Sequence, residues 1–80
     1  MATTTDLQRF AFNLRRLRKK AGMTQAELAA KLDWSGPFLS NMECGKRIPR
    51  LHTVAKVAAA LGVDIHALFL PEKKRETPVD

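Results

Sequence analysis

The stretch DWSGPFLSNMECGKR, from Asp33 to Arg47, decides how this chain folds. Ser35 can cap a helix with its hydroxyl oxygen, and Pro37 falls in the first turn, where its missing N–H costs little. Gly45 is the expected left-handed stop. The stretch therefore predicts a short helix over residues 35–44.

A second short helix precedes this one by only a few residues. Thr24 is its expected N-cap, and Glu27, three residues later, completes a capping box. The helix is predicted to run to about Leu32, where the Asp33–Trp34 turn begins. Two short helices joined by so tight a turn form a helix-turn-helix.

The first helix of the chain is predicted to begin at Thr5 or Asp6, because Thr5 and Gln8 match a capping box. Gly22 is its expected stop. Apolar residues recur along it at steps of three and four and predict one buried stripe: Leu7, Phe10, Leu14, Leu17 and Ala21.

Two further helices are expected after the central pair. Pro49 bars a helix just before it, so Lys46–Arg50 is predicted to be a loop. A fourth helix follows over residues 51–61 and ends at Gly62. Asp64 then caps a short fifth helix in the apolar segment IHALFL. Strand-like alternation is absent from the sequence, so the expected fold class is all-α.

The composition allows one small domain. The chain has 80 residues, of which 45% are hydrophobic, enough for one modest core. We expect a flexible N-terminus at residues 1–5, the folded domain at residues 6–70 and a polar, disordered tail at residues 71–80. A single cysteine excludes an internal disulfide and a thiol-based metal cluster. No membrane span or signal peptide is recognisable, so a cytoplasmic protein is expected.

Charge points towards nucleic acid. Fourteen Lys and Arg against eight Asp and Glu give a net charge of +6, the footprint of a small DNA-binding domain, although such charge can also serve solubility alone. Lys46, Arg47 and Arg50 stand just before the fourth helix, where each cation is unfavourable by ~0.3–1 kcal/mol. A DNA phosphate docking there relieves this conflict; a solvated loop is the alternative.

These motifs together resemble the Cro/cI-type helix-turn-helix family, also called the XRE family, over residues 10–70. The matching elements are Phe10, Leu14, LRKKAGMTQAELAAKL (residues 17–32), Ser35, Leu39-Ser40, Met42-Glu43, Gly45-Lys46, Pro49 and VAAALGVDIHALF (residues 57–69). The resemblance implies a compact five-helix domain of the lambda-repressor-like type. It also implies a prokaryotic or phage-encoded regulator, commonly a dimer.

The resemblance implies roles for several residues. The helix at residues 35–44 lies in the major groove of double-stranded DNA, while the preceding helix crosses the backbone. Arg18 and Glu43 form a structural ion pair that braces the first helix against the third. The expected phosphate contacts are Gln25, Ser35, Gly36, Lys46, Arg47 and Arg50. For Gln25 the alternative is an ordinary exposed side chain at the start of its helix.

The expected base-facing residues are Pro37, Phe38, Ser40 and Asn41. At about 100° per residue, a buried Leu39 directs most of them outward. Asn41 can pair with adenine, which is worth ~1–3 kcal/mol of discrimination, and Pro37 or Phe38 can pack on a thymine methyl group. Alternatively, Phe38 belongs partly to the core and Asn41 is merely solvated. So few polar groups leave part of the specificity to DNA shape.

The fifth helix offers more apolar surface than one thin helix can bury within its own domain. We therefore expect a homodimer interface at Ile65, Leu68, Phe69 and Leu70. A two-fold dimer predicts a near-palindromic operator.

The expected function is a sequence-specific DNA-binding transcriptional regulator. The alternative is an antitoxin or another protein-interaction regulator on the same scaffold, with a toxin or a regulatory protein as its partner. The sequence contains no catalytic constellation, metal cluster or cofactor motif, so neither an enzyme nor a cofactor is expected.

Overall fold

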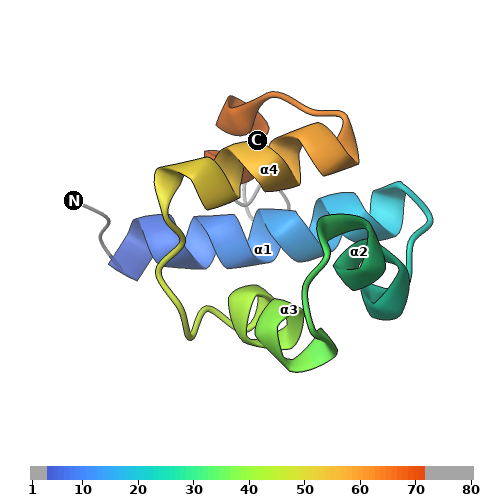
Figure 1. Ribbon diagram of the computed structural model, residues 1–80. Helices are drawn as coiled ribbons and strands as arrows, with labels where there is room; N and C mark the ends of the chain where they lie inside the picture. Colours follow the sequence, from blue (N-terminus) through green and yellow to red (C-terminus); the bar gives the residue numbers. More distant parts are fainter. Residues whose placement is uncertain (1–3, 72–80) are drawn as a thin grey trace.

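The computed structural model describes residues 4–71 (Figure 1). It contains the helices α1 (Thr4–Lys20), α2 (Gln25–Leu32), α3 (Gly36–Glu43) and α4 (Leu51–Leu61), followed by the 3-10 helix η1 (Ile65–Phe69). Strands are absent from these residues, in agreement with the all-α prediction. None of the helices within residues 4–71 combines the length and the apolar character that a membrane span requires.

The expected fifth α-helix is instead the 3-10 helix η1, five residues long. Asp64 caps it as predicted, because its carboxylate accepts the N–H of His66 at 3.3 Å. The segment between Asp64 and Pro71 has room for little more than one turn. At that length the tighter 3-10 form is common.

The start signals read from the sequence are present at α2 and α3. Thr24 Oγ1 accepts the N–H of Glu27 at 3.0 Å, and the Thr24 N–H donates to Glu27 Oε1 at 2.8 Å, so both halves of the capping box form. Ser35 Oγ accepts the N–H of Phe38 at 3.2 Å. α4 begins after Arg50 without a side-chain cap. Its first backbone N–H groups therefore receive no cap from Arg50.

α1 differs from the prediction at both ends. It begins at Thr4, so Thr5 lies inside the first turn rather than ahead of it. The expected capping box of Thr5 lies outside the side chains that the structure describes, as does the tail beyond Pro71. At the other end, Ala21 is exposed and does not belong to the buried stripe. The reason is that α1 ends at Lys20, before the chain turns away.

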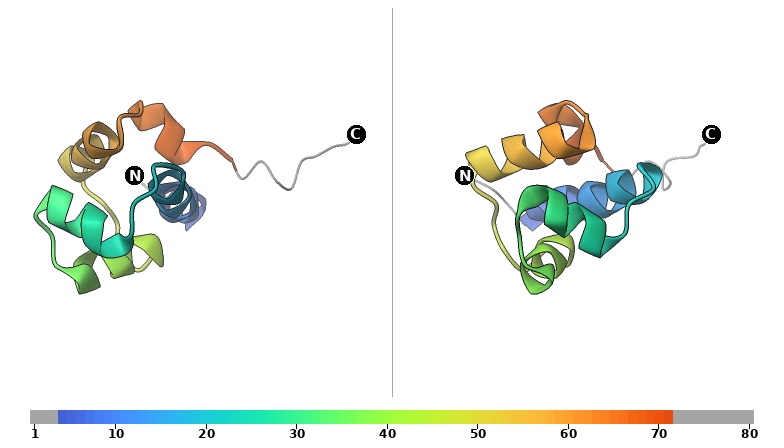
Figure 2. Two further views of the ribbon diagram at one scale, coloured as in Figure 1. Left: turned by 90° about the vertical axis from the view of Figure 1, so that its right-hand side faces the viewer. Right: turned by 45° about the vertical axis from the view of Figure 1, so that its right-hand side comes forward.

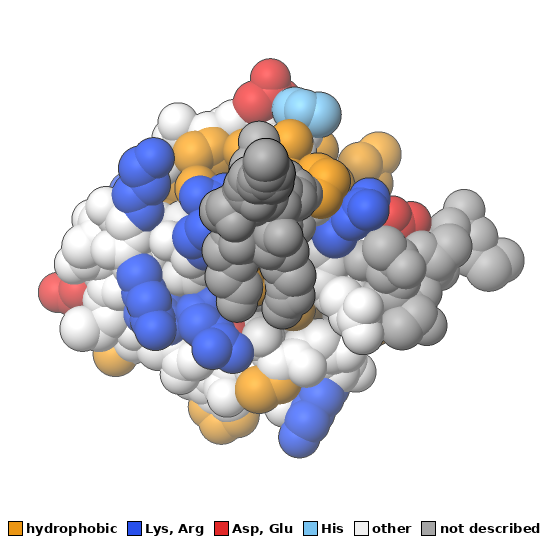
Figure 3. Space-filling model, turned by 180° about the vertical axis from the view of Figure 1, so that it is seen from behind, with side chains coloured by type: hydrophobic (Ala, Val, Ile, Leu, Met, Phe, Trp, Pro, Cys, Tyr) orange, Lys and Arg blue, Asp and Glu red, His pale blue; other side chains and the backbone are white. Residues whose placement is uncertain are grey.

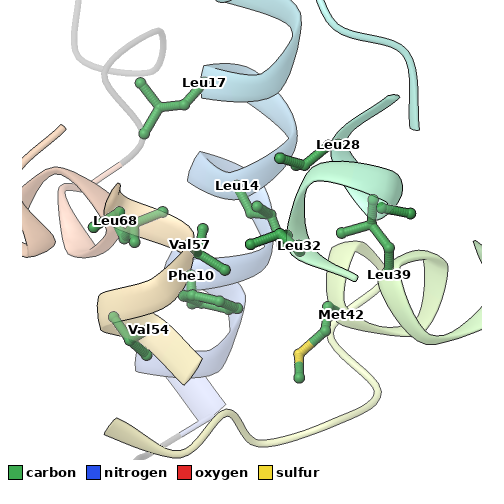
Figure 4. Packing of buried hydrophobic residues seen from close by; sticks show 12 residues of the cluster. Phe10, Leu14, Leu17, Leu28, Leu32, Leu39, Met42, Val54, Val57 and Leu68 are labelled. Atoms are coloured by element: carbon green, nitrogen blue, oxygen red, sulfur yellow. The ribbon is translucent and has the colours of Figure 1, made fainter. Parts of the chain in front are cut away.

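The core lies where α1 meets the other elements (Figure 4). α4 and η1 lie on one side of α1 and α3 on the other, while α2 contacts both α3 and α4 (Figures 1 and 2). The buried cluster consists of Phe10, Leu14, Leu17, Leu28, Ala29, Leu32, Leu39, Met42, Val54, Val57, Ala58 and Leu68. Because every helix contributes to it, one core supports the helix-turn-helix.

Asn13 is a buried polar residue that the sequence patterns did not single out. Its side-chain amide donates to the carbonyl oxygens of Leu68 at 3.2 Å and Leu70 at 2.8 Å. The same amide reaches the Arg9 carbonyl at 2.9 Å, and Arg16 donates to its Oδ1 at 3.1 Å. Asn13 therefore ties the end of η1 to α1.

Candidate nucleic-acid interface

The turn between α2 and α3 depends on one residue in the left-handed conformation. Asp33 has φ 61° and is the one non-glycine residue with positive φ among those described. Its N–H donates to the Ala30 carbonyl at 3.1 Å, and the N–H of Trp34 donates to that of Ala29 at 2.8 Å. Asp tolerates this conformation better than most residues, because its short polar side chain can bond locally. The turn closes α2 and directs the chain into α3.

α3 lies at the edge of the fold, with one face not covered by another element (Figure 1). Pro37 is exposed, and Ser40 and Asn41 are half-exposed. The Ser40 and Asn41 side chains form no hydrogen bond within residues 4–71. Leu39 faces the core at 0% exposure, as expected. Three of the four expected base-facing side chains are therefore open to a ligand.

Phe38, the fourth, is half-buried and packs against the core. The Trp34 ring meets it edge-on, with ring centroids 4.8 Å apart and an interplanar angle of 79°. The Arg47 guanidinium carbon lies 4.9 Å from the centroid of the Phe38 ring. The partial-core alternative thus describes Phe38 better than free projection into solvent.

Arg18 and Glu43 form the ion pair that the family resemblance implied. Arg18 Nε lies 2.6 Å from Glu43 Oε2, and Arg18 Nη2 lies 3.1 Å from Oε1, so the contact is bidentate. Arg18 Nη1 also donates to the Met23 carbonyl at 2.9 Å. The pair fastens α1 to α3 inside the protein.

Gln25 is coupled to this pair. Its Nε2 donates to Glu43 Oε1 at 3.0 Å, and the residue is half-buried at the first position of α2. Only one of the two amide hydrogens is needed for that bond. The expected phosphate contact would therefore use the second hydrogen, with the side chain already held by Glu43.

The loop after α3 carries three exposed cations, Lys46, Arg47 and Arg50. No carboxylate within residues 4–71 pairs with any of them. Gly45, with φ 74°, turns the chain back after α3. This loop therefore presents uncompensated positive charge next to the uncovered face of α3.

A second group of cations lies on α1. Arg15, Arg16, Lys19 and Lys20 are all exposed in its C-terminal half. Seen from behind, several Lys and Arg side chains gather on the left of the molecule, which is the side of the C-terminal end of α1 (Figures 1 and 3). The positive charge of the protein thus extends beyond the loop next to α3.

The remaining titratable side chains are dispersed. His52 and His66 are exposed on different elements, and Cys44 is exposed at the end of α3. Within residues 4–71, no three His, Cys, Asp or Glu side chains gather closely enough to hold a metal ion.

The structure corrects one residue of the expected dimer interface, Leu68. Leu68 is 0% exposed and belongs to the protein's own core, so its side chain is not available to a partner. Phe69 is half-buried, with its ring centroid 5.9 Å from that of Phe10. Ile65 remains 38% exposed. The correction has a tertiary cause: the Asn13 hydrogen bonds hold η1 close to α1.

Two other apolar side chains are far more exposed. Ile48 is 67% exposed and Leu51 is 77% exposed. Leu51 lines a groove of about 370 Å³, together with Asp6, Leu7, Phe10, Pro49, Val54 and Phe69. The sequence patterns did not single out this surface. The sequence did offer one sign of an exposed apolar surface: Ile48 and Leu51 flank Pro49-Arg50 in a segment that is otherwise polar.

Comparison with known proteins defines the class. The HTH_3 family model, described as helix-turn-helix, matches residues 14–68. The chain therefore belongs to this family, which confirms the resemblance found in the sequence. It is a transcriptional regulator of the DNA-binding helix-turn-helix type.

Individual relatives agree with this class. An uncharacterized HTH-type transcriptional regulator, y4dJ of Sinorhizobium fredii, is 41% identical over 66 residues, which are 82% of this chain and 83% of the relative. The crystal structure of the hypothetical transcription factor NHTF from Neisseria matches with TM-score 0.79 and 33% identity, over 94% of this chain and 87% of that one. The restriction-modification controller protein C.AhdI from Aeromonas hydrophila matches with TM-score 0.74 and 33% identity, over 80% and 97%.

Proposed function

We propose that the protein is a sequence-specific, homodimeric DNA-binding regulator that inserts α3 into the major groove of a near-palindromic operator. The observation that carries the proposal is the pairing of two features. The outer face of α3 is uncovered, and the adjoining loop holds Lys46, Arg47 and Arg50 without carboxylate partners among residues 4–71. Such a surface is complementary to a groove bordered by phosphates.

The phosphate contacts supply affinity and fix the register of α3. The loop cations and Gln25 reach the backbone on either side of the groove. Ser35 and Gly36 lie at the start of α3, where backbone N–H groups and the helix dipole attract a phosphate. Such contacts position the protein without reading sequence.

Base recognition is sparse and centres on Asn41, with help from Ser40 and Pro37. Asn41 has its side-chain amide free of hydrogen bonds within residues 4–71, so it can offer a donor and an acceptor to adenine. Pro37 can contact only apolar groups such as a thymine methyl. DNA shape supplies the rest of the specificity.

Dimerisation uses the apolar surface around Ile48 and Leu51, together with Phe69, which lines the same groove as Leu51, and with Ile65 and Leu70 of the expected interface. The high exposure of Ile48 (67%) and Leu51 (77%) supports this assignment. A second copy would cover these side chains and the adjoining groove. Two copies of α3 about 34 Å apart then read two half-sites.

The protein acts in the cytoplasm of a bacterium or of a phage-infected cell and performs no catalysis of its own. The bacterial relatives named as transcription factors or regulators support this reading. No described contact or relative favours the antitoxin alternative.

The test is selection of bound duplexes from a random library, followed by titration of the selected site at two salt concentrations. The affinity is expected to fall steeply with salt, with a slope of about −0.9 per phosphate neutralised. Arg50→Gln should reduce this slope by about one unit. Lys56→Gln, on the exposed side of α4, serves as the matched control and should leave it unchanged. A protein indifferent to every duplex at low salt would refute the proposal.

A further inference from the structure

We infer that Phe38 is a positioning residue for Arg47: its ring holds the Arg47 guanidinium beside α3, ready to contact a DNA phosphate. This inference rests on the proposed function and gives Phe38 a role other than reading a base. It depends on three features: the contact of Trp34 with Phe38, the contact of Arg47 with Phe38, and the turn after α3 that brings Arg47 close to Phe38.

The Phe38 ring is itself held firmly. Ser35 Oγ accepts the Phe38 N–H at 3.2 Å and fixes the backbone in the first turn of α3. The Trp34 ring packs edge-on against Phe38, with centroids 4.8 Å apart. The backbone N–H of Trp34 donates to the Ala29 carbonyl at 2.8 Å, and the Trp34 side chain packs against the core. The ring therefore offers a fixed platform.

The turn after α3 explains how Arg47 reaches this platform. α3 has eight residues, or about 12 Å at 1.5 Å per residue, and Phe38 lies in its first turn. Gly45, in the left-handed conformation with φ 74°, reverses the chain. The Lys46 N–H then donates to the Asn41 carbonyl at 3.0 Å. The chain thus folds back along α3, and the long Arg47 side chain covers the remaining distance.

The chemistry of the guanidinium group makes this placement useful. The group is planar, and its N–H donors lie in the plane while its face can stack on an aromatic ring. A guanidinium over Phe38 therefore keeps its donors for a bidentate contact with phosphate oxygens. No hydrogen bond or ion pair within residues 4–71 occupies those donors. The ring restricts the side chain in advance, so less freedom is lost on binding.

This role and a thymine-methyl contact predict different outcomes when Phe38 is changed. Loss of a base contact alters the preference at one position of the site. Loss of a platform for a phosphate-binding arginine weakens all sites to a similar degree. The second outcome is the one expected here.

The experiment compares the wild-type protein with Phe38→Leu, Phe38→Tyr, Arg47→Gln and the double variant Phe38→Leu/Arg47→Gln. Affinity is measured on the selected duplex and across the site library. Phe38→Leu removes the aromatic face, so Arg47 must lose its side-chain freedom on binding, which should weaken binding about two- to tenfold. Phe38→Tyr keeps the face and should bind like wild type. In the Arg47→Gln background, Phe38→Leu should cause no further loss.

Several controls make the result decisive. Thermal unfolding of each variant checks that the half-buried site still folds, and in the free protein the NMR signals of the Arg47 Cδ protons should lose their ring-current shift in Phe38→Leu. An equal loss in the Arg47→Gln background, or a changed base preference, would overturn the inference while leaving the proposed function intact. Wild-type protein that binds no duplex would refute both.

Discussion

Removing the Glu43 carboxylate should greatly reduce the stability of this protein. The carboxylate lies 2.6 Å and 3.1 Å from two nitrogens of Arg18, and the Arg18 and Glu43 side chains are only 10% and 3% exposed. Glu43→Ala leaves the Arg18 guanidinium inside the protein with no counter-charge from residues 4–71. Its remaining hydrogen bond is the one to the Met23 carbonyl at 2.9 Å.

The expected cost follows from this burial. Breaking one side of a buried ion pair destabilises by ~3–5 kcal/mol. A domain of 80 residues is typically stable by about 4–12 kcal/mol, so the loss is a large share of the total. At ~4–8 °C per kcal/mol for a domain this small, the melting temperature should fall by at least about 12 °C. The lost hydrogen bond from Gln25 to Glu43 adds little to this cost, because the half-buried Gln25 amide can bond to water instead.

The assay is urea and thermal unfolding followed by far-ultraviolet circular dichroism. Glu27→Gln is the matched control: Glu27 is exposed, and the amide keeps an oxygen for the capping box, so the cost should stay below about 0.5 kcal/mol. The double variant Arg18→Met/Glu43→Leu removes both charges and should recover most of the stability, since apolar replacement of a whole buried pair is often neutral.

Salt separates this explanation from a surface effect. A pair on the surface loses its value in high salt, whereas a buried pair is screened much less. The difference between wild type and Glu43→Ala should therefore persist in 0.5 M salt, a concentration chosen well above the ~0.1 M at which the screening length is about 10 Å. A loss below about 1 kcal/mol, or one abolished by salt, would show that the pair does not brace α1 against α3.

Four further changes test the rest of the structure. Asn13→Leu removes the side-chain donor to the Leu68 and Leu70 carbonyl groups, so the free energy of unfolding should fall by about 1–3 kcal/mol, with faster amide exchange in η1; unchanged exchange would contradict the role assigned to Asn13. Leu68→Ala should destabilise the monomer by ~2–5 kcal/mol, because the side chain is 0% exposed; an effect on association alone would restore it to the interface. Leu51→Glu should abolish dimers in analytical ultracentrifugation while the fold persists, and unaltered association would place the interface elsewhere. Asn41→Ala should relax selection at one base pair by ~1–3 kcal/mol, and an unchanged preference across the library would remove Asn41 from base reading.

The local features of the fold were predictable because each depends on a few consecutive residues. The capping box of Thr24 and Glu27 and the Ser35 cap each use donors and acceptors at most three positions apart. The bounds of α2 followed from such signals and those of α4 from Pro49 and Gly62, together with the spacing of apolar residues. The Arg18–Glu43 pair was different, because it was implied by the family resemblance rather than by local chemistry.

The candidate site was predictable in its general position but not in its contacts. The outward placement of Pro37, Ser40 and Asn41 follows from helical geometry once Leu39 is taken as buried. The contact of Phe38 with Arg47 does not, since it depends on how the loop folds back along α3. Ile48 and Leu51 were missed for a related reason: nothing in their own segment says whether a neighbouring element covers them.

The sequence by itself determined the caps of α2 and α3, the approximate bounds of α2, α3 and α4, most of the stripe that each helix turns inward and the excess of positive charge, because these depend on backbone capping, helical period and composition. Only the tertiary structure decided that Leu68 belongs to the core and that Asn13 binds the carbonyl groups of Leu68 and Leu70, which are 55 and 57 positions further along the chain. It also decided that Gln25 and Arg18 both bind the carboxylate of Glu43. The physical reason is that burial and hydrogen-bond partners are set by the packing of elements far apart in the chain, so no single segment of the sequence determines them.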